Sequence, residues 1–376
     1  MNPVEIPALI PTPTENRFTR RSFLQSTGAL VLGAGFLRFS GTAEAADVKG
    51  AELSTPSGKK LRGLYPILET PFTADDKLDT AGLAAEVAFL NRGRVAGMIW
   101  PVFASSWSTL SDAERIEGAE TILAAGKGGT AAMAIAVQNM AWDTATSVRY
   151  AKHAADHGAD AIVSIPPNNG WNVSDQAVLD YYKAIGAATD LPLIVQTRGT
   201  ISVDLMIRMF HEIPTMKATK DEVGDPLKRI AALMEGTGNG LAVWAAGGGT
   251  GELLLEELPL GFSGLCPTPQ YADLLQQCME LWWAGKKGEA FDMFSRVQGF
   301  ATIPGATEYL MVARGVFKET TKMRRQPMEP EAPKPAGGGR PGGGTGGGAR
   351  SGPIDESGKK VVREALETYL RPYLRA

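Results

Sequence analysis

The 376-residue sequence has few of the residue types that build disulfide frameworks and zinc sites. Its two cysteines, Cys266 and Cys278, form no Cys-x-x-Cys pair and no other metal-ligand spacing. We expect two buried free thiols, although a disulfide between them stays open in an oxidising compartment. A formal net charge of -3 gives no excess of positive charge, which argues against a nucleic acid partner.

Histidine is also scarce, with three in the whole chain. His153 and His157 stand four residues apart on a predicted helix, a spacing that can bind zinc on one helix face. They lack the intervening glutamate of a metalloprotease motif, so we expect solvated surface histidines. His211 precedes Glu212 at a predicted helix end, where a positive charge is favourable. The sequence therefore predicts no metal site.

Long apolar runs are missing too, and the one mildly apolar segment lies near the N-terminus. The motif Arg-Arg-Ser-Phe-Leu at residues 20–24 precedes an apolar stretch at 27–39 and the small-residue sequence Ala-Glu-Ala at 43–45. This order is typical of a twin-arginine export signal, and the stretch is short of the ~20 apolar residues of a membrane span. We expect residues 1–45 to be removed and the protein to act in the periplasm or otherwise outside the cytoplasm, with no stable membrane insertion.

Short apolar runs alternate with amphipathic helical stretches from Leu61 onward, as in βα units with a parallel sheet. Eight such strands in roughly 250 residues favour an α/β fold of the (β/α)8 TIM barrel type over a doubly wound sheet. In such barrels the chemistry lies at the C-terminal ends of the strands. The predicted strands are 64–68, 97–102, 131–137, 161–165, 192–196, 215–220, 241–246 and 264–266.

Composition divides the rest of the chain. Glycine and proline dominate one late segment, which has almost no side chains to bury, so we expect a disordered surface insertion rather than a partner-binding arm. The predicted organisation is a linker at 46–60, a barrel core at 61–270, additional C-terminal helices at 271–328, the Gly/Pro-rich insertion at 329–353 and a terminal helix at 354–376.

Five motifs occur in a familiar order along the predicted strands and helices. They are Leu-Glu-Thr-Pro-Phe at 68–72, Thr-Leu-Ser-Asp-Ala-Glu-Arg at 109–115, His-Gly-Ala-Asp-Ala at 157–161, Asp-Leu-Pro-Leu-Ile at 190–194 and Lys-Ala-Thr-Lys-Asp-Glu-Val-Gly-Asp at 217–225. Their order and spacing resemble the dihydrodipicolinate synthase and N-acetylneuraminate lyase family of class I aldolases, over about residues 61–371.

The resemblance places Lys220 on the family's Schiff-base lysine. It implies that Lys220 forms an imine with a 2-keto acid or sugar acid, and that the protein is an aldolase, lyase or dehydratase without a cofactor. Burial in an apolar barrel mouth disfavours an ammonium group and frees a nucleophilic amine. Without the family context, an ordinary surface charge is the simpler interpretation. The resemblance also implies a homodimer or homotetramer.

The sequence departs from the family where the substrate binds. The family's Gly-Thr-Thr-Gly-Glu is replaced by Val-Phe-Ala-Ser-Ser at 102–106, and Gln196 stands in place of the proton-shuttling tyrosine, although an amide does not titrate in the useful range. Arg198 is a candidate for the substrate carboxylate, with a loop salt bridge as the alternative. The residues predicted to bind substrate are Thr70, Ser105, Ser106, Asn168, Gln196, Arg198 and Gly249.

These departures leave two interpretations open. In the first, Lys220 still forms a Schiff base and the proton relay is rebuilt, with Glu69 or with water. In the second, catalysis is reduced and the barrel binds a small carboxylate or sugar acid. An exported protein lies away from the cytoplasmic aspartate semialdehyde of lysine biosynthesis, so we expect a scavenging or catabolic role.

Overall fold

The computed structural model describes residues 53–245, 248–324 and 354–375. The expected export signal and the Gly/Pro-rich insertion lie outside these residues. None of the described helices is long and apolar enough to cross a membrane.

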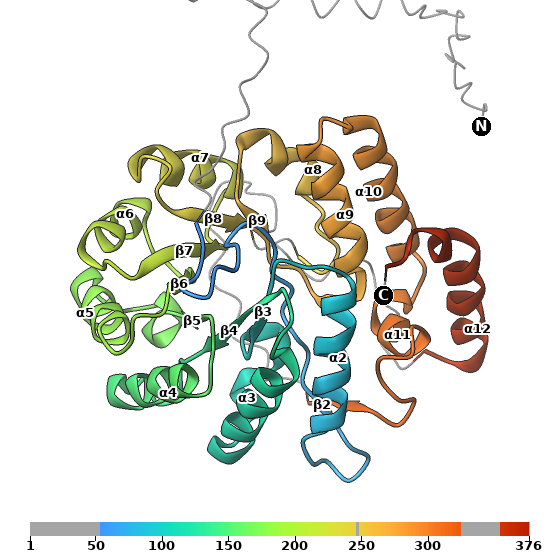
Figure 1. Ribbon diagram of the computed structural model, residues 1–376, viewed down its shortest axis with the longest axis horizontal. Helices are drawn as coiled ribbons and strands as arrows, with labels where there is room; N and C mark the ends of the chain where they lie inside the picture. The colour runs from blue at the N-terminus through green and yellow to red at the C-terminus, as the bar shows by residue number, and fades with distance from the viewer. Residues whose placement is uncertain (1–52, 246–247, 325–353, 376) are drawn as a thin grey trace, which may run out of the picture. The chain divides into compact units, whose positions relative to one another are not determined.

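Eight parallel strands form one ring, in the order β1-β9-β8-β7-β6-β5-β4-β3 (Figure 1). The ring closes between its two end strands, where Ile67 bridges Ile99 and the Leu68 amide donates to the Ile99 carbonyl at 3.0 Å. The predicted TIM barrel is thereby confirmed. The strands are β1 Gly63–Leu64, β3 Gly97–Trp100, β4 Ala132–Ala136, β5 Ala161–Ser164, β6 Leu193–Gln196, β7 Met216–Asp221, β8 Ala242–Ala245 and β9 Gly264–Leu265.

Helices alternate with the strands and surround them (Figure 1). The Ser111 hydroxyl, for example, caps α3 by accepting from the Glu114 amide, while Glu114 bonds back to the Ser111 amide. The barrel helices are α2 Thr80–Arg92, α3 Asp112–Gly126, α4 Thr144–Asp156, α5 Asp175–Gly186, α6 Val203–Glu212, α7 Pro226–Gly236 and α8 Leu254–Glu257. The additional C-terminal helices are α9 Ala272–Trp283, α10 Lys287–Ala301, α11 Ala306–Ala313 and α12 Glu356–Ala365, and β2 Pro71–Phe72 pairs with β10 Lys322–Met323.

Side-chain alternation along the strands separates two hydrophobic clusters. Large outward residues pack under the helices, whereas the inward positions of β4, β5, β7 and β8 are mostly small, as at Ala134 and Ala218. Inside the ring, Tyr65 stacks on Trp244 with ring centroids 4.1 Å apart, and the indole nitrogen donates to the Leu61 carbonyl at 3.0 Å. The barrel interior is therefore a packed core and not a pore.

The described end of the segment expected to be a linker forms a turn against the barrel. Ser54 bridges Lys60, and Lys59 Nζ lies 2.9 Å from Asp160 Oδ2, one residue before β5 begins. The Tyr65 hydroxyl donates to the Lys60 carbonyl at 2.6 Å. These contacts place the turn at the N-terminal ends of the strands, opposite the end where chemistry is expected.

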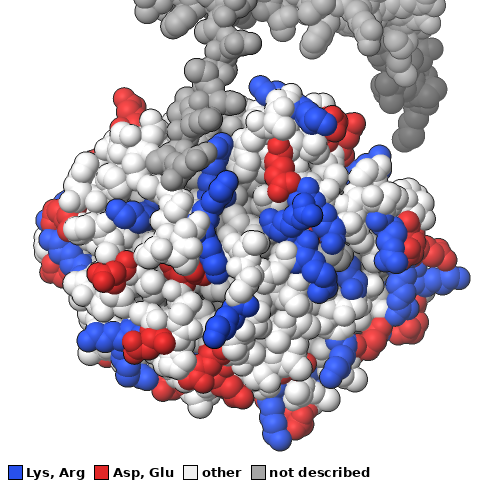
Figure 2. All heavy atoms as spheres, in the orientation of Figure 1, with Lys and Arg blue, Asp and Glu red and all other residues white. Residues whose placement is uncertain are grey.

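On the face shown in Figure 2, side chains of both charge signs are interspersed.

A buried ion pair holds the C-terminal helices to the barrel. Arg314 NH2 lies 2.7 Å from Asp273 Oδ2, and both side chains are 1% exposed. The Arg375 amide donates to the same carboxylate at 3.0 Å. The Arg314 guanidinium lies 4.5 Å from the centre of the Phe89 ring. The pair thus connects α9, the segment after α11, the chain end and α2.

The Asp273→Ala variant is expected to lower the free energy of unfolding by about 3–5 kcal/mol, because it leaves the buried Arg314 charge without this carboxylate. Urea denaturation followed by circular dichroism measures the change. The Asp75→Ala variant is the control, since its ion pair with Lys77 lies at the surface, and it should unfold like the wild type. A loss below about 1 kcal/mol in Asp273→Ala would contradict the anchoring role.

Candidate functional site

The ends of β6 and β7 bring two predicted site residues side by side. Gln196 and Lys220 are register partners, and Lys220 is also the register partner of Trp244 on β8. Alternation from the inward Ala218 directs Lys220 into the barrel, where it is 5% exposed. Lys220 therefore lies at the C-terminal end of the strands, where barrel enzymes carry out their chemistry.

A third residue, Glu222, joins these two. Lys220 Nζ donates to Glu222 Oε1 at 2.5 Å, and Gln196 Nε2 donates to Glu222 Oε2 at 2.5 Å. Burial alone raises the pKa of Glu222, but the charges of Lys220 and Arg198 and the two hydrogen bonds bring it below its ordinary value. The sequence predicted apolar surroundings for the lysine amine. The structure instead places a carboxylate beside it, which compensates for the burial of a charge.

Glu222 was not among the site residues predicted from the sequence. Residues i and i+2 of an extended segment point to the same side, so the spacing between Lys220 and Glu222 already held the signal. The hydrogen bond from Gln196, on the neighbouring strand, shows that the Glu222 carboxylate lies between Gln196 and Lys220.

The opposite side of β7 fixes the position of this pair. Asp221 is buried and binds Arg229 at 2.7 Å, and its carboxylate accepts from the Thr197 hydroxyl at 2.8 Å. The same hydroxyl accepts from the Glu222 amide at 2.8 Å. The strand ends are therefore tied together on their outer side, which limits how far Lys220 and Glu222 can move.

Aromatic side chains line one part of the barrel mouth. Trp107 meets Phe103 and Trp142 edge-on, with ring centroids 6.5 and 5.6 Å apart. The Arg198 guanidinium lies 4.2 Å from the centre of the Phe103 ring, a cation–π contact. Arg198 is thus held against the loop after β3, close enough to Glu222 for its charge to affect the pKa of that carboxyl.

Two predicted binding hydroxyls are engaged within the protein. Thr70 donates to the Ser105 carbonyl at 2.6 Å and accepts from the Trp100 indole at 3.0 Å. The Ser105 hydroxyl donates to the Leu68 carbonyl at 2.6 Å. These bonds join the segment after β1 to the loop after β3, in which Ser106 adopts a left-handed conformation with φ of 53°.

Two further predicted residues have contacts of their own in separate loops. Asn168 is exposed in the turn Pro167–Gly170 and donates to the Trp171 carbonyl at 2.6 Å. The Gly249 carbonyl accepts from the Thr268 hydroxyl at 3.0 Å. Of the predicted site residues, the structure brings together Lys220, Gln196 and Arg198 around Glu222.

A second carboxyl group lies in the segment after β1. Glu69 has the same inward parity as Tyr65 and accepts from Gln270 Nε2 at 2.9 Å. Burial raises the pKa of Glu69 to about 7, and the bond from Gln270 offsets part of that effect. The Glu69 amide donates at 3.0 Å to Glu86, whose own pKa burial raises well above its ordinary value. A carboxyl with a pKa near 7 can both accept and donate protons near neutrality.

The cysteines are free and buried, as predicted. Burial raises the pKa of Cys278 to about 12 and that of Cys266, at the end of β9, well above its ordinary range. Both are thiols at neutral pH, so neither is suited to act as a nucleophile.

Enzymes of one name are similar to this chain in sequence. A 4-hydroxy-tetrahydrodipicolinate synthase from Chlorobium luteolum is 26% identical over 287 residues, which cover 72% of this chain and 94% of the relative. The enzyme of the same name from Methanosarcina mazei is 28% identical over 181 residues, or 46% and 59% of the two chains. The chain spans about three fifths of the length of the Methanosarcina relatives it matches.

Solved structures extend the likeness in fold. The N-acetylneuraminate lyase from Mycoplasma synoviae matches with a TM-score of 0.64 and 21% identity, over 82% of this chain and 98% of that one. The sequence model described as the Dihydrodipicolinate synthetase family matches residues 60–328. With the barrel, the strand-end motifs and this match over most of its length, the chain belongs to the dihydrodipicolinate synthetase family.

Proposed function

We propose that this protein is a lyase or aldolase that forms a Schiff base between Lys220 and a 2-keto acid or sugar acid. The observation that carries the proposal is the buried contact of 2.5 Å between Lys220 and Glu222 at the C-terminal ends of the strands. A nucleophile and an adjacent base within hydrogen-bond reach are the pattern that covalent catalysis needs.

Glu222 supplies the proton transfers of imine formation in this mechanism. Its carboxylate takes a proton from the Lys220 ammonium, and the neutral amine then adds to the keto carbonyl to give a carbinolamine. Glu222 returns the proton to the carbinolamine hydroxyl, which leaves as water, so that a protonated imine and the Glu222 carboxylate remain. Gln196 does not titrate but holds the carboxylate in place. The group that transfers protons thus follows β7 and does not lie on β6, where the resemblance places the family's tyrosine.

Two polar groups would orient the substrate. Arg198 presents a planar guanidinium beside the aromatic rim and suits a substrate carboxylate. Within the described part of the chain, Gln196 Oε1 is buried without a hydrogen-bond partner. A hydroxyl donor such as that of a sugar acid would satisfy this oxygen, since an unpaired buried acceptor costs stability.

Glu69 is proposed as the base that removes a proton from the imine-bound substrate. Because its pKa is about 7, the base is mostly protonated at lower pH, and the rate should fall about tenfold per pH unit below 7. The exchange of the methyl protons of pyruvate for deuterium, followed by NMR from pH 5.5 to 8.5, measures this step. The Glu69→Gln variant should be slow and lack the rising limb near pH 7; the same limb in that variant would rule out Glu69.

The test of the function is borohydride reduction of the protein with pyruvate and a panel of other 2-keto acids, followed by peptide mass spectrometry. A reduced adduct on Lys220 is the expected result. No adduct with any member of the panel, together with reversible binding of one of them, would instead support a barrel that only binds a small carboxylate or sugar acid.

We further propose that the protein is exported by the twin-arginine pathway and assembles as a homodimer or homotetramer. The support for export is the Arg-Arg-Ser-Phe-Leu motif at residues 20–24 with its apolar and small-residue sequel. N-terminal sequencing of periplasmic protein should give a start near Ala46, and a cytoplasmic protein with an intact N-terminus would refute export.

Light scattering measures the assembly, and a monomer at micromolar concentration would refute the proposed homodimer or homotetramer.

A further inference from the structure

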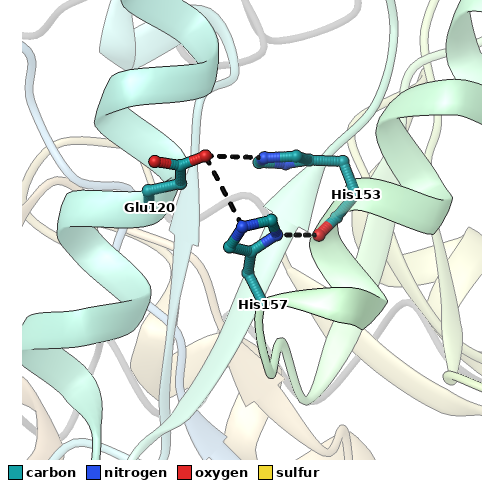
Figure 3. Close-up of side chains that lie close together, drawn as sticks. All are labelled: Glu120, His153 and His157. Carbon is teal, nitrogen blue, oxygen red and sulfur yellow. Dashed lines mark hydrogen bonds and ion pairs between the residues drawn. The ribbon is translucent and has the colours of Figure 1, made fainter.

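Three potential metal ligands meet on the outside of the barrel, on two neighbouring helices (Figure 3). Glu120 comes from α3, His153 lies in the last turn of α4, and His157 caps the C-terminal end of α4. Their ligand atoms all lie within 4.8 Å of one another. The spacing of the two histidines indicated a possible metal site in the sequence. Glu120 could not be assigned to it, because it comes from a different helix.

The distances suit one small ion. Glu120 Oε1 lies 3.0 Å from His153 Nε2 and 3.5 Å from His157 Nε2. A tetrahedral Zn²⁺ with bonds of about 2.0–2.1 Å holds its ligand atoms about 3.3 Å apart. Small side-chain adjustments would therefore place all three ligand atoms around a shared centre.

A backbone contact fixes how His157 presents its ring. His157 Nδ1 lies 2.8 Å from the His153 carbonyl oxygen, and because a carbonyl only accepts, Nδ1 carries the hydrogen. In a neutral ring the lone pair is then on Nε2, which faces the Glu120 carboxylate (Figure 3). A proton or a metal ion between Nε2 and the carboxylate would satisfy both acceptors, and an N–H bond to a carbonyl is the usual way to orient a metal-binding imidazole.

We propose that Glu120, His153 and His157 bind a late first-row divalent cation such as Zn²⁺, with water completing its coordination. Two imidazole ligands favour Zn²⁺ over Mg²⁺ or Ca²⁺, which prefer oxygen. The side chains are accessible, with 48%, 19% and 43% of their surfaces exposed, and the C-terminal end of a helix favours positive charge. The ion would connect α3 to α4, and this site is independent of the chemistry proposed for Lys220.

Isothermal titration of the protein without a histidine tag tests the proposal at pH 8, where an ordinary imidazole is neutral and no proton substitutes for the metal. We expect one Zn²⁺ per chain with a micromolar or tighter Kd, and no binding of Mg²⁺ at the same concentration. At a hundredfold excess over Kd, Zn²⁺ should raise the Tm by about 5 °C. The absence of saturable Zn²⁺ binding by the wild type would overturn the proposal.

Variants locate the site. His157→Ala and Glu120→Gln should each weaken Zn²⁺ binding by at least about 100-fold, since even partners that only orient a ligand cost 10–100-fold. His211→Ala is the matched control because it removes the remaining histidine of the chain, and it should keep the stoichiometry and Kd. Circular dichroism verifies folding of each variant. Unchanged binding by His157→Ala, or loss of binding in His211→Ala, would place the ion elsewhere.

Discussion

Replacing Lys220 with arginine is expected to abolish the borohydride-stable adduct and to slow pyruvate proton exchange by at least about 10⁴-fold. A guanidinium retains the positive charge opposite Glu222, so the ion pair and the fold should survive. It is not deprotonated in proteins, however, and therefore offers no nucleophilic lone pair. Peptide mass spectrometry after reduction and the NMR exchange rate measure the two effects.

The matched control is Lys217→Arg on the same strand. Lys217 lies at the register shift between β6 and β7, near the N-terminal ends of the strands and beside Ser54 and Thr215, whereas Lys220 lies at the C-terminal end. This variant should form the adduct at the rate of the wild type. An undiminished adduct in Lys220→Arg, carried by another lysine, would show that the nucleophile has been assigned to the wrong residue.

The barrel could be predicted because its strands leave a strong signal in the sequence. The predicted strands at 192–196 and 215–220 correspond to β6 Leu193–Gln196 and β7 Met216–Asp221. Parallel barrel strands are buried on both faces, so each reads as a short apolar run between amphipathic helices. The position of Lys220 at a strand end followed from that periodicity together with the resemblance to the family.

The bonding partners of the site could not be predicted in the same way. Whether the Thr70 and Ser105 hydroxyls bind substrate depends on which carbonyls lie beside them. These carbonyls, of Ser105 and Leu68, belong to segments more than 30 residues away in the sequence. Glu120 reaches the two histidines from a different helix for the same reason. Contacts between elements distant in sequence leave no fixed spacing, so only the folded structure identifies them.

The Glu222→Gln variant is expected to fold and to bind 2-keto acids, but to form the imine about 10²–10³-fold more slowly. Glutamine keeps the size of the side chain and can still accept from Lys220 Nζ. It does not take up the ammonium proton, and it has no acid to protonate the departing carbinolamine hydroxyl. A time course of borohydride trapping at saturating pyruvate measures the rate of imine formation directly.

The pH profile and a second variant separate proton transfer from mere charge pairing. The surrounding charges hold the pKa of Glu222 below its ordinary value, so it stays a carboxylate through the neutral range and should not limit imine formation until the pH falls into the acidic range. Glu222→Asp keeps an acid one methylene shorter and should recover part of the rate that Glu222→Gln loses. If both variants trapped pyruvate as fast as the wild type, Glu222 would serve only as the counter-charge of Lys220, and the proton would have to pass through water or Glu69.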